Sequence, residues 1–254
     1  MRWYGKIGII ICKIIKTVNI LVDMNTDQIE RYKRHIQLSE IGINGQEKLL
    51  KAKVLVVGAG GLGSPVLQYL SAAGIGCIGI VDNDVVSFSN LQRQVLFREN
   101  QIGNNKAVMA KENLNQVNSE IDYRAFPVAL SEDNAEDIIS SFDVVLGCTD
   151  NFKSRLLIDN VTRKQKKAFV HASIGAFNGQ VAVFNYDGAI SYVDLFGNPT
   201  DDDKSLGVVG VLPGIIGSMQ ANEAIKIILN TGNILKNKLL LYDIFTFEFN
   251  IIDL

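Results

Sequence analysis

The stretch Val54-Leu55-Val56-Val57-Gly58-Ala59-Gly60-Gly61-Leu62-Gly63 decides the predicted fold. Its first four residues form a β-branched and aliphatic run, typical of a strand covered on both faces, and the run stops at a glycine cluster. Residues 65–73 follow as a predicted helix, with Ser64 placed to cap it and Gly74 just past its end. Ile78 to Val81 is the next predicted strand, which completes a strand–helix–strand unit of about 30 residues, as expected of a parallel crossover.

The four glycines of this stretch, Gly58, Gly60, Gly61 and Gly63, match the dinucleotide-binding fingerprint between a strand and a helix. Glycine lets the backbone turn tightly and approach phosphates, and the helix N-terminus adds amides and a partial positive charge. Asp82, at the end of the second strand, is placed to bind ribose hydroxyls. The loop therefore predicts a nucleotide site. By itself it favours NAD or FAD, and a turn needed only for close packing is the alternative.

The alternation of helices and strands continues along the chain. Helices are predicted at 106–116, 134–140, 153–163 and 212–229, and strands at 123–126, 144–146, 169–170, 180–184, 239–242 and 245–251. The expected fold is α/β, a Rossmann-like, doubly wound and mostly parallel sheet with an antiparallel C-terminal portion. Before it, Asp27 and Glu30 stand in capping-box relation and predict a short basic helix, an N-terminal arm.

The first 24 residues are treated separately from the predicted domain, residues 25–254. The apolar run 7–22 is interrupted by Lys13, Lys16 and Asn19, so it is too short and too charged to span a bilayer, and no small-residue cleavage site follows. We expect either an upstream start before a natural initiator at Met24 or a peripheral segment, and assign it no function.

Composition excludes several classes of protein. The formal net charge is −2, so no global field favours nucleic acid or a membrane surface. The three cysteines, Cys12, Cys77 and Cys148, stand far apart, which argues against a disulfide framework and a four-thiolate zinc site. A reducing cytoplasm is the expected compartment.

The residues after the second predicted strand suggest which nucleotide binds. They are Asp82 and Asp84, then Ser89, Asn90, Leu91, Gln92, Arg93 and Gln94, and later Lys106. Two cations and two carboxamides beside a glycine loop suit a triphosphate whose pyrophosphate must leave. Asp150 and Asn151 follow another strand that ends at the same edge of the sheet, so Asp150 is a candidate Mg²⁺ ligand. Surface charges are the alternative for Arg93 and Lys106, and helix capping is the alternative for Asp150.

With these residues the sequence resembles the HesA/MoeB/ThiF family, bacterial relatives of ubiquitin-activating enzymes. The matching stretches are Arg31-Tyr32-Lys33-Arg34-His35, Gly42 to Gln46, Gly58 to Gly63, Asp82 to Gln94, Gly103 with Lys106, Thr149-Asp150-Asn151, Gly179-Gln180 and Pro213 to Ser218. The resemblance implies that ATP and Mg²⁺ activate the C-terminal Gly-Gly carboxylate of a ubiquitin-like sulfur carrier as an acyl-adenylate. It assigns ATP contacts to Gly61, Asp82, Ser89 to Arg93, Lys106 and Asp150-Asn151. It also implies a homodimer in which Arg34 reaches the partner's active site.

The sequence departs from the family where cysteines are expected. Many members hold a structural zinc with two Cys-x-x-Cys pairs. Here Ser191-Tyr192-Val193-Asp194 lacks the first pair and no second pair follows, so zinc is predicted absent. A cysteine often found about ten residues before the equivalent of Pro213 is replaced near Asp203, so we expect the chain to stop at the acyl-adenylate. Without zinc, the polar span 186–204 is expected to be less constrained.

Three functions stay open at this point. The first is adenylylation of a sulfur carrier for molybdopterin or thiamine biosynthesis, and the second is activation of another peptide or protein tail. The third is an NAD-binding oxidoreductase or a non-catalytic nucleotide-binding module, which the residues Ser89 to Gln94 and Asp150 disfavour.

Overall fold

The computed structural model describes residues 24–200 and 207–254, and the chain divides into two compact units, 1–47 and 48–254. The described part of the first unit is helical, with α2 (Thr26–Arg31), α3 (Lys33–Ile36) and most of α4 (Gly42–Lys51). Asn25 caps α2 by accepting a hydrogen bond from Gln28 N at 2.9 Å, while Gln28 Oε1 accepts from Asn25 N at 3.1 Å. The predicted capping box of Asp27 and Glu30 is therefore wrong. The helix begins two residues earlier, because Asn25 and Gln28 supply the same pair of contacts.

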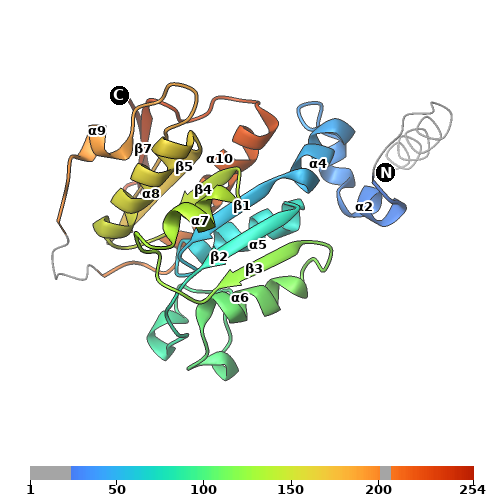
Figure 1. Cartoon of the computed structure of the whole chain (residues 1–254), viewed down its shortest axis with the longest axis horizontal. Coiled ribbons are helices and arrows are strands. Elements are labelled where there is room, and N and C mark those ends of the chain that lie inside the picture. The colour runs from blue at the N-terminus through green and yellow to red at the C-terminus, as the bar shows by residue number, and fades with distance from the viewer. Residues whose placement is uncertain (1–23, 201–206) are drawn as a thin grey trace. The chain divides into compact units, whose positions relative to one another are not determined.

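The second unit is built on one sheet of eight strands in the order β3-β2-β1-β4-β5-β6-β7-β8 (Figure 1). The strands are β1 (Lys53–Val57), β2 (Cys77–Val81), β3 (Asp122–Phe126), β4 (Val144–Gly147), β5 (Ala168–Gly175), β6 (Asn178–Phe184), β7 (Lys238–Asp243) and β8 (Glu248–Asp253). Strands β1 to β5 pair in parallel, and β5 to β8 pair antiparallel. The predicted doubly wound sheet with its antiparallel C-terminal portion is confirmed. Its strand order reverses between β1 and β4, the place where such sheets bind ligands.

Helices cover both faces of the central strands. On one face α5 (Gly63–Ala73) contacts α6 (Lys106–Asn115) and α10 (Leu212–Leu229), and on the other α8 (Phe152–Gln165) contacts α7 (Ala135–Ser140) and α9 (Tyr192–Phe196). The side chains of β2 and β4 are accordingly buried on both faces, which explains their continuous apolar sequence. Two short 3-10 helices, η1 (Phe88–Asn90) and η2 (Glu99–Gln101), lie between β2 and α6. No helix in the described ranges has the length and apolar content needed to cross a bilayer.

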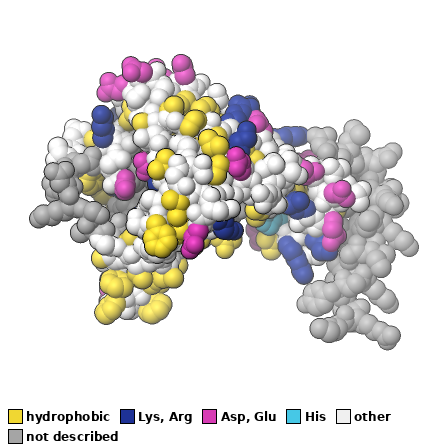
Figure 2. Space-filling view, turned by 90° about the horizontal axis from the view of Figure 1, so that it is seen from below, with side chains coloured by type: hydrophobic (Ala, Val, Ile, Leu, Met, Phe, Trp, Pro, Cys, Tyr) yellow, Lys and Arg dark blue, Asp and Glu magenta, His cyan; other side chains and the backbone are white. Residues whose placement is uncertain are grey.

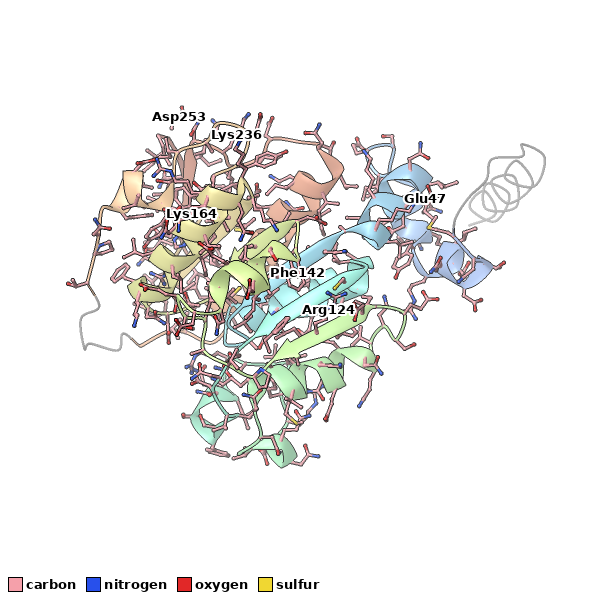
Figure 3. All side chains as sticks on the ribbon, in the orientation of Figure 1. Glu47, Arg124, Phe142, Lys164, Lys236 and Asp253 are labelled. Atoms are coloured by element: carbon pink, nitrogen blue, oxygen red, sulfur yellow. The ribbon has the colours of Figure 1, made fainter. Side chains whose placement is uncertain are left out.

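The core on the α8 face combines aliphatic side chains with buried aromatic rings, and the side chains are drawn in Figure 3. Phe142, labelled in that view, is 1% exposed, and its ring would lie 2.3 Å from a Cβ placed at Gly79. Phe169 and Phe184 pack at a centroid distance of 6.0 Å. Because Gly79 has no side chain, the Phe142 ring lies directly on the sheet.

The first part of the polar span is held by hydrogen bonds to α8. Tyr192 in α9 is 1% exposed, and the buried Asp159 carboxylate accepts hydrogen bonds from Tyr192 N at 2.8 Å and from Asn185 Nδ2 at 2.9 Å. Ser191 caps α9 by accepting from Asp194 N. Asp159 of α8 therefore fastens residues 191–196 to the rest of the unit, while the lower constraint expected over the span 186–204 stays a prediction. Residues 201–206, like residues 1–23 of the predicted extension 1–24, lie outside the described residues.

Candidate functional site

The glycine loop is packed so tightly that two of its positions exclude any side chain. Gly58 has φ of +97°, and a Cβ there would lie 2.6 Å from the carbonyl oxygen of Cys148. A Cβ at Gly63 would lie 2.0 Å from the carbonyl oxygen of Gly58. The loop therefore turns back on itself and rests against the end of β4.

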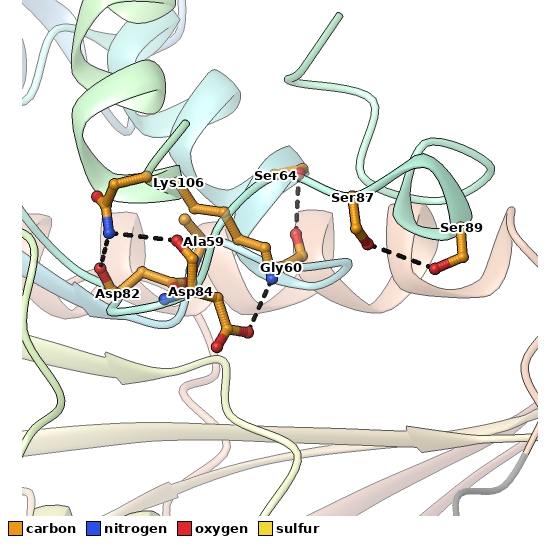
Figure 4. Close-up of polar contacts among 9 residues, drawn as sticks. Ala59, Gly60, Ser64, Asp82, Asp84, Ser87, Ser89 and Lys106 are labelled. Atoms are coloured by element: carbon orange, nitrogen blue, oxygen red, sulfur yellow. Dashed lines mark hydrogen bonds and ion pairs between the residues drawn. The ribbon is translucent and has the colours of Figure 1, made fainter. Parts of the chain in front are cut away.

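Helix α5 begins directly at the end of this loop. Its N-cap is Leu62, which offers no capping side chain, and the Ser64 hydroxyl instead donates to the Gly60 carbonyl at 2.8 Å (Figure 4). The prediction that Ser64 caps the helix is wrong, since the helix begins before it, at Gly63. A helix start with no side chain over it suits an anion.

Asp82 holds the loop from the end of β2. One carboxylate oxygen accepts from Ala59 N at 2.7 Å and the other from Asp84 N at 2.9 Å (Figure 4). Burial raises the pKa of Asp82 above its ordinary value, although both amide bonds and the nearby Lys106 oppose this shift. The contact with the glycine loop is thus found, while the predicted contact with ribose stays a prediction.

Lys106 brings a buried positive charge to the same loop. Its ammonium group lies 2.9 Å from the Asp84 carboxylate, and its side chain is 6% exposed against 66% for Asp84. Asn105 caps α6 through a bond from Val108 N, and its amide donates to the carbonyl oxygens of Asp82 and Asp84. The start of α6 and the end of β2 are therefore fastened together, which fixes the position of Lys106.

The turn that follows η1 places Arg93 and Gln94 against the glycine loop. Arg93 Cδ would lie 3.5 Å from a Cβ on Gly61, and Gln94 Nε2 the same distance from one on Gly60. Both side chains belong to a turn in which the amides of Arg93 and Gln94 donate to the Asn90 carbonyl. Gln94 is 4% exposed, and its Oε1 has no partner among the described residues. The structure thus brings Arg93 and Gln94 of the predicted segment Ser89 to Gln94 to the predicted loop, while Gln92 lies against Gly210 and Ser89 against Ser87.

Asp150 lies two residues beyond Cys148, the residue that touches Gly58. Helix capping is performed by Asn151, whose Oδ1 accepts from Ser154 N at 2.8 Å, and not by Asp150. Asp150 itself is exposed. No group of three or more His, Cys, Asp or Glu that could hold a metal occurs within residues 24–200 and 207–254. One carboxylate fits Mg²⁺ that arrives with nucleotide phosphates, because this ion commonly takes only one or two protein carboxylates there.

Arg34 belongs to the first compact unit, on α3, where it is exposed. The neighbouring His35 has its Nδ1 2.9 Å from Gln46 Oε1, a contact that holds the histidine against α4. The proposed action of Arg34 in a partner's site remains a prediction.

Neither described cysteine is prepared for sulfur chemistry. Burial raises the pKa of Cys77 to about 11, and it raises that of the fully buried Cys148 further. The Cys148 thiol donates to Gln220 Oε1 at 3.3 Å. These thiols are packing groups, and Cys12 lies outside the described residues.

Two hollows lie on the second unit, and neither was predicted from the sequence. A cavity of about 900 Å³ lies beside Arg93, between residues 92–95 and the start of α10, with Pro65, Val211 and Met219 in its wall. A groove of about 590 Å³ runs over β5 to β8, with Ser173, Gln180, Leu241 and Asn250 among its lining residues. Both depend on contacts between distant segments, which no local pattern predicts.

Residues 32–254 match the sequence model of the ThiF family. The chain belongs to the ThiF family. A protein of Porphyra purpurea named probable molybdopterin-synthase adenylyltransferase is 44% identical over 229 residues, covering 88% of this chain and 60% of that protein. The adenylyltransferase and sulfurtransferase MOCS3 of Anopheles gambiae is 42% identical over 230 residues, with 89% and 52% covered.

A ThiF-family relative closer in length comes from Thermus thermophilus. This sulfur carrier protein adenylyltransferase is 41% identical over 227 residues, covering 85% of the chain and 84% of that protein. The chain therefore spans only about half to three fifths of the Anopheles and Porphyra relatives but most of the Thermus one.

Two solved structures share the fold. Escherichia coli MccB with MccA-N7isoASN superposes with a TM-score of 0.79 at 23% identity, covering 91% of this chain and 73% of that one. The crystal structure of PaaA gives 0.78 at 21% identity, with 91% and 74% covered. At these identities the likeness supports the α/β fold of the ThiF family and nothing finer.

Proposed function

We propose that this chain uses ATP to adenylylate the C-terminal carboxylate of a small sulfur-carrier protein. The observation that carries the proposal is the convergence of the glycine loop, Arg93 and Lys106 at the edge of the sheet where β1 and β4 end. Relatives named adenylyltransferases, at 41% and 44% identity, support the same activity.

The reaction requires alignment and charge stabilisation from the protein. A carboxylate oxygen of the carrier's Gly-Gly terminus forms a bond to the α-phosphorus of ATP, and the bond from that phosphorus to the bridging oxygen breaks, releasing pyrophosphate. The attacking carboxylate is already ionised, so no general base is needed. Arg93 and Lys106 offset the charge on the leaving phosphates. Lys106 then pairs with a phosphate in place of Asp84, or with both at once.

The remaining nucleotide contacts follow from the loop geometry. We assign the phosphates to the amides of Gly58 to Gly63, the ribose to Asp82, and further polar contacts to Asp84, Ser89 to Gln94 and Asn151. Mg²⁺, when bound with ATP, supplies positive charge to the phosphates, and Asp150 would hold it. Arg34 of a second copy would complete the site, so the proposal includes a homodimer. The proposal also places the chain in the cytoplasm and assigns it no structural zinc.

A protein substrate suits the surface around the antiparallel strands. Phe177, Phe245, Phe247 and Phe249, here called the hairpin aromatics, are 42%, 74%, 76% and 50% exposed. Phe177 and Phe245 pack at 5.2 Å and join the β5–β6 and β7–β8 turns. Figure 2, seen from below, shows hydrophobic side chains gathered in separate patches, with charged ones scattered between them. An exposed apolar cluster beside the β5–β8 groove is the type of surface that a protein partner covers.

The test is ATP–pyrophosphate exchange with candidate carriers that end in Gly-Gly. We expect exchange with one such carrier, none with the same carrier lacking its last two residues, and none with Asp150→Ala. Lys164→Ala, an exposed change at the far end of α8, is the control. Normal exchange in Asp150→Ala would remove this residue from the mechanism. Exchange driven only by short peptides would point to another tail, and NAD binding without any exchange would favour an oxidoreductase.

A further inference from the structure

The backbone that leads from β4 to Asp150 is held from both faces of the sheet. From α10, Gln220 Nε2 donates to the carbonyl oxygens of Gly147 at 3.0 Å and Val170 at 2.9 Å. From α8, Arg155 Nη2 donates to the carbonyl oxygen of Thr149 at 2.9 Å. Two buried side chains therefore fix alternate carbonyls directly before Asp150.

Arg155 is an unusual residue to find in this place. It is 8% exposed, its guanidinium carbon lies 5.3 Å from the Phe152 ring centroid, and its Nε has no partner among the described residues. Those residues also offer it no ion pair with a carboxylate. A buried cation costs stability unless it is paired, so packing alone gives no reason for a charged group here.

The carbonyl that Arg155 holds connects two parts of the proposed site. On one side of Thr149 is Cys148, whose carbonyl oxygen would lie 2.6 Å from a Cβ on Gly58 and whose Cβ would lie 3.7 Å from one on Gly63. On the other side is Asp150. A rotation of the Thr149 peptide would therefore move the carboxylate relative to the glycine loop, and shifts of about 1 Å are enough to impair such sites.

We propose that Arg155 is a positioning residue for Asp150. It fixes the Thr149 peptide so that the Asp150 carboxylate faces the phosphates over the glycine loop. This inference rests on the proposed function, in which Asp150 holds the Mg²⁺ that arrives with ATP. It adds a residue that touches neither nucleotide nor metal.

The experiment measures ATP binding by calorimetry, in excess Mg²⁺ and in EDTA, without any carrier. The readout is the gain in affinity that Mg²⁺ gives. Asp150→Ala should lose this gain. Arg155→Met should reduce it by about tenfold or more, as is typical when a group that orients a metal ligand is removed. Its affinity in EDTA should change much less. Arg163→Met, an exposed change on the same helix, should leave both affinities unchanged.

A second variant covers the case in which Arg155→Met does not fold. Arg155→Lys keeps the charge and one donor but not the planar fork, so it should retain part of the gain. Hydrogen exchange of residues 148–152 should be faster in it than in the wild type. A folded variant with the full Mg²⁺ gain, or with equal losses in Mg²⁺ and EDTA, would overturn the proposal, as would a wild type with no gain. Intact Mg²⁺-dependent ATP binding without exchange on any carrier would sink only the proposed function.

Discussion

Lys106 and Asp84 illustrate at the residue scale how this chain keeps a charge ready beside its glycine loop. A nearly buried ammonium group is costly unless an anion lies next to it, and the exposed Asp84 carboxylate, at 2.9 Å, provides that anion. A triphosphate offers the same partner with more charge. The pair therefore stabilises the charge of Lys106 in the absence of a ligand. Because Asp84 is exposed, a phosphate can replace it as the partner of Lys106.

His171 gives the first prediction at this scale. Its ring is fully buried among aromatic side chains, with Tyr192 at 5.1 Å, so burial lowers its pKa well below the ordinary value, and the Arg155 charge adds to this. The unfolded chain therefore binds this proton first as pH falls. Stability should be unaffected above the unfolded pKa of about 6.5 and fall below it, by at most about 1.4 kcal/mol per pH unit.

Urea denaturation between pH 7.5 and 5 measures this dependence for the wild type and for His171→Leu. The variant should show a smaller slope below pH 6.5, whatever its stability at neutral pH. Equal slopes in the two proteins would mean that His171 is protonated in the folded chain.

At the element scale, the segments with a strong local signal were predicted, whereas the starts of two helices were misplaced. Helix α10 was predicted over the residues that it occupies, because Pro213 starts it and its apolar run is long. The start of α2 was misplaced because Asn25 and Asp27, both good capping residues, stand two positions apart, and the start of α5 was misplaced because this helix begins with no capping side chain. The residues of the candidate site also fall into a predicted group and a group that was not predicted. Contiguous motifs predicted the glycine loop, Arg93, Lys106 and Asp150, whereas Arg155 and Gln220 act through carbonyls of other segments, which leave no local pattern.

Gln220 supports a prediction about how α10 is fastened to the sheet. In Gln220→Leu the buried carbonyls of Gly147 and Val170 would lose a donor each, so we expect a loss of about 2–4 kcal/mol in the free energy of unfolding. Denaturant titration checks this value, with the exposed Asn222→Leu on the same helix as control. A loss below about 0.5 kcal/mol, the usual range for surface changes, would show that these carbonyls find other donors.

At the scale of the whole molecule, the sheet changes character where its strands turn antiparallel. The parallel half is covered on both faces and carries the glycine loop and Asp150 at its edge. Beyond β6, the outermost strand β8 is exposed along its whole length, and the groove and the hairpin aromatics lie on this half. Under the proposed function one half holds the nucleotide and the other receives the protein substrate, so the two should be separable by mutation.

The hairpin aromatics make that separation testable. Phe247 is 76% exposed and Phe245 is 74% exposed, so Phe247→Ser and Phe245→Ser should cost little stability. In the exchange assay we expect the KM for the carrier to rise by about tenfold or more, the effect of losing an aromatic anchor at an interface, while the KM for ATP stays unchanged. Tyr69→Ser, 58% exposed on α5, removes a comparable aromatic surface elsewhere and should change neither constant.

If both phenylalanine variants keep the carrier KM of the wild type, the carrier docks elsewhere on the chain. A rise in the ATP KM instead would show that these turns support the nucleotide site, and that the two halves of the sheet are not independent.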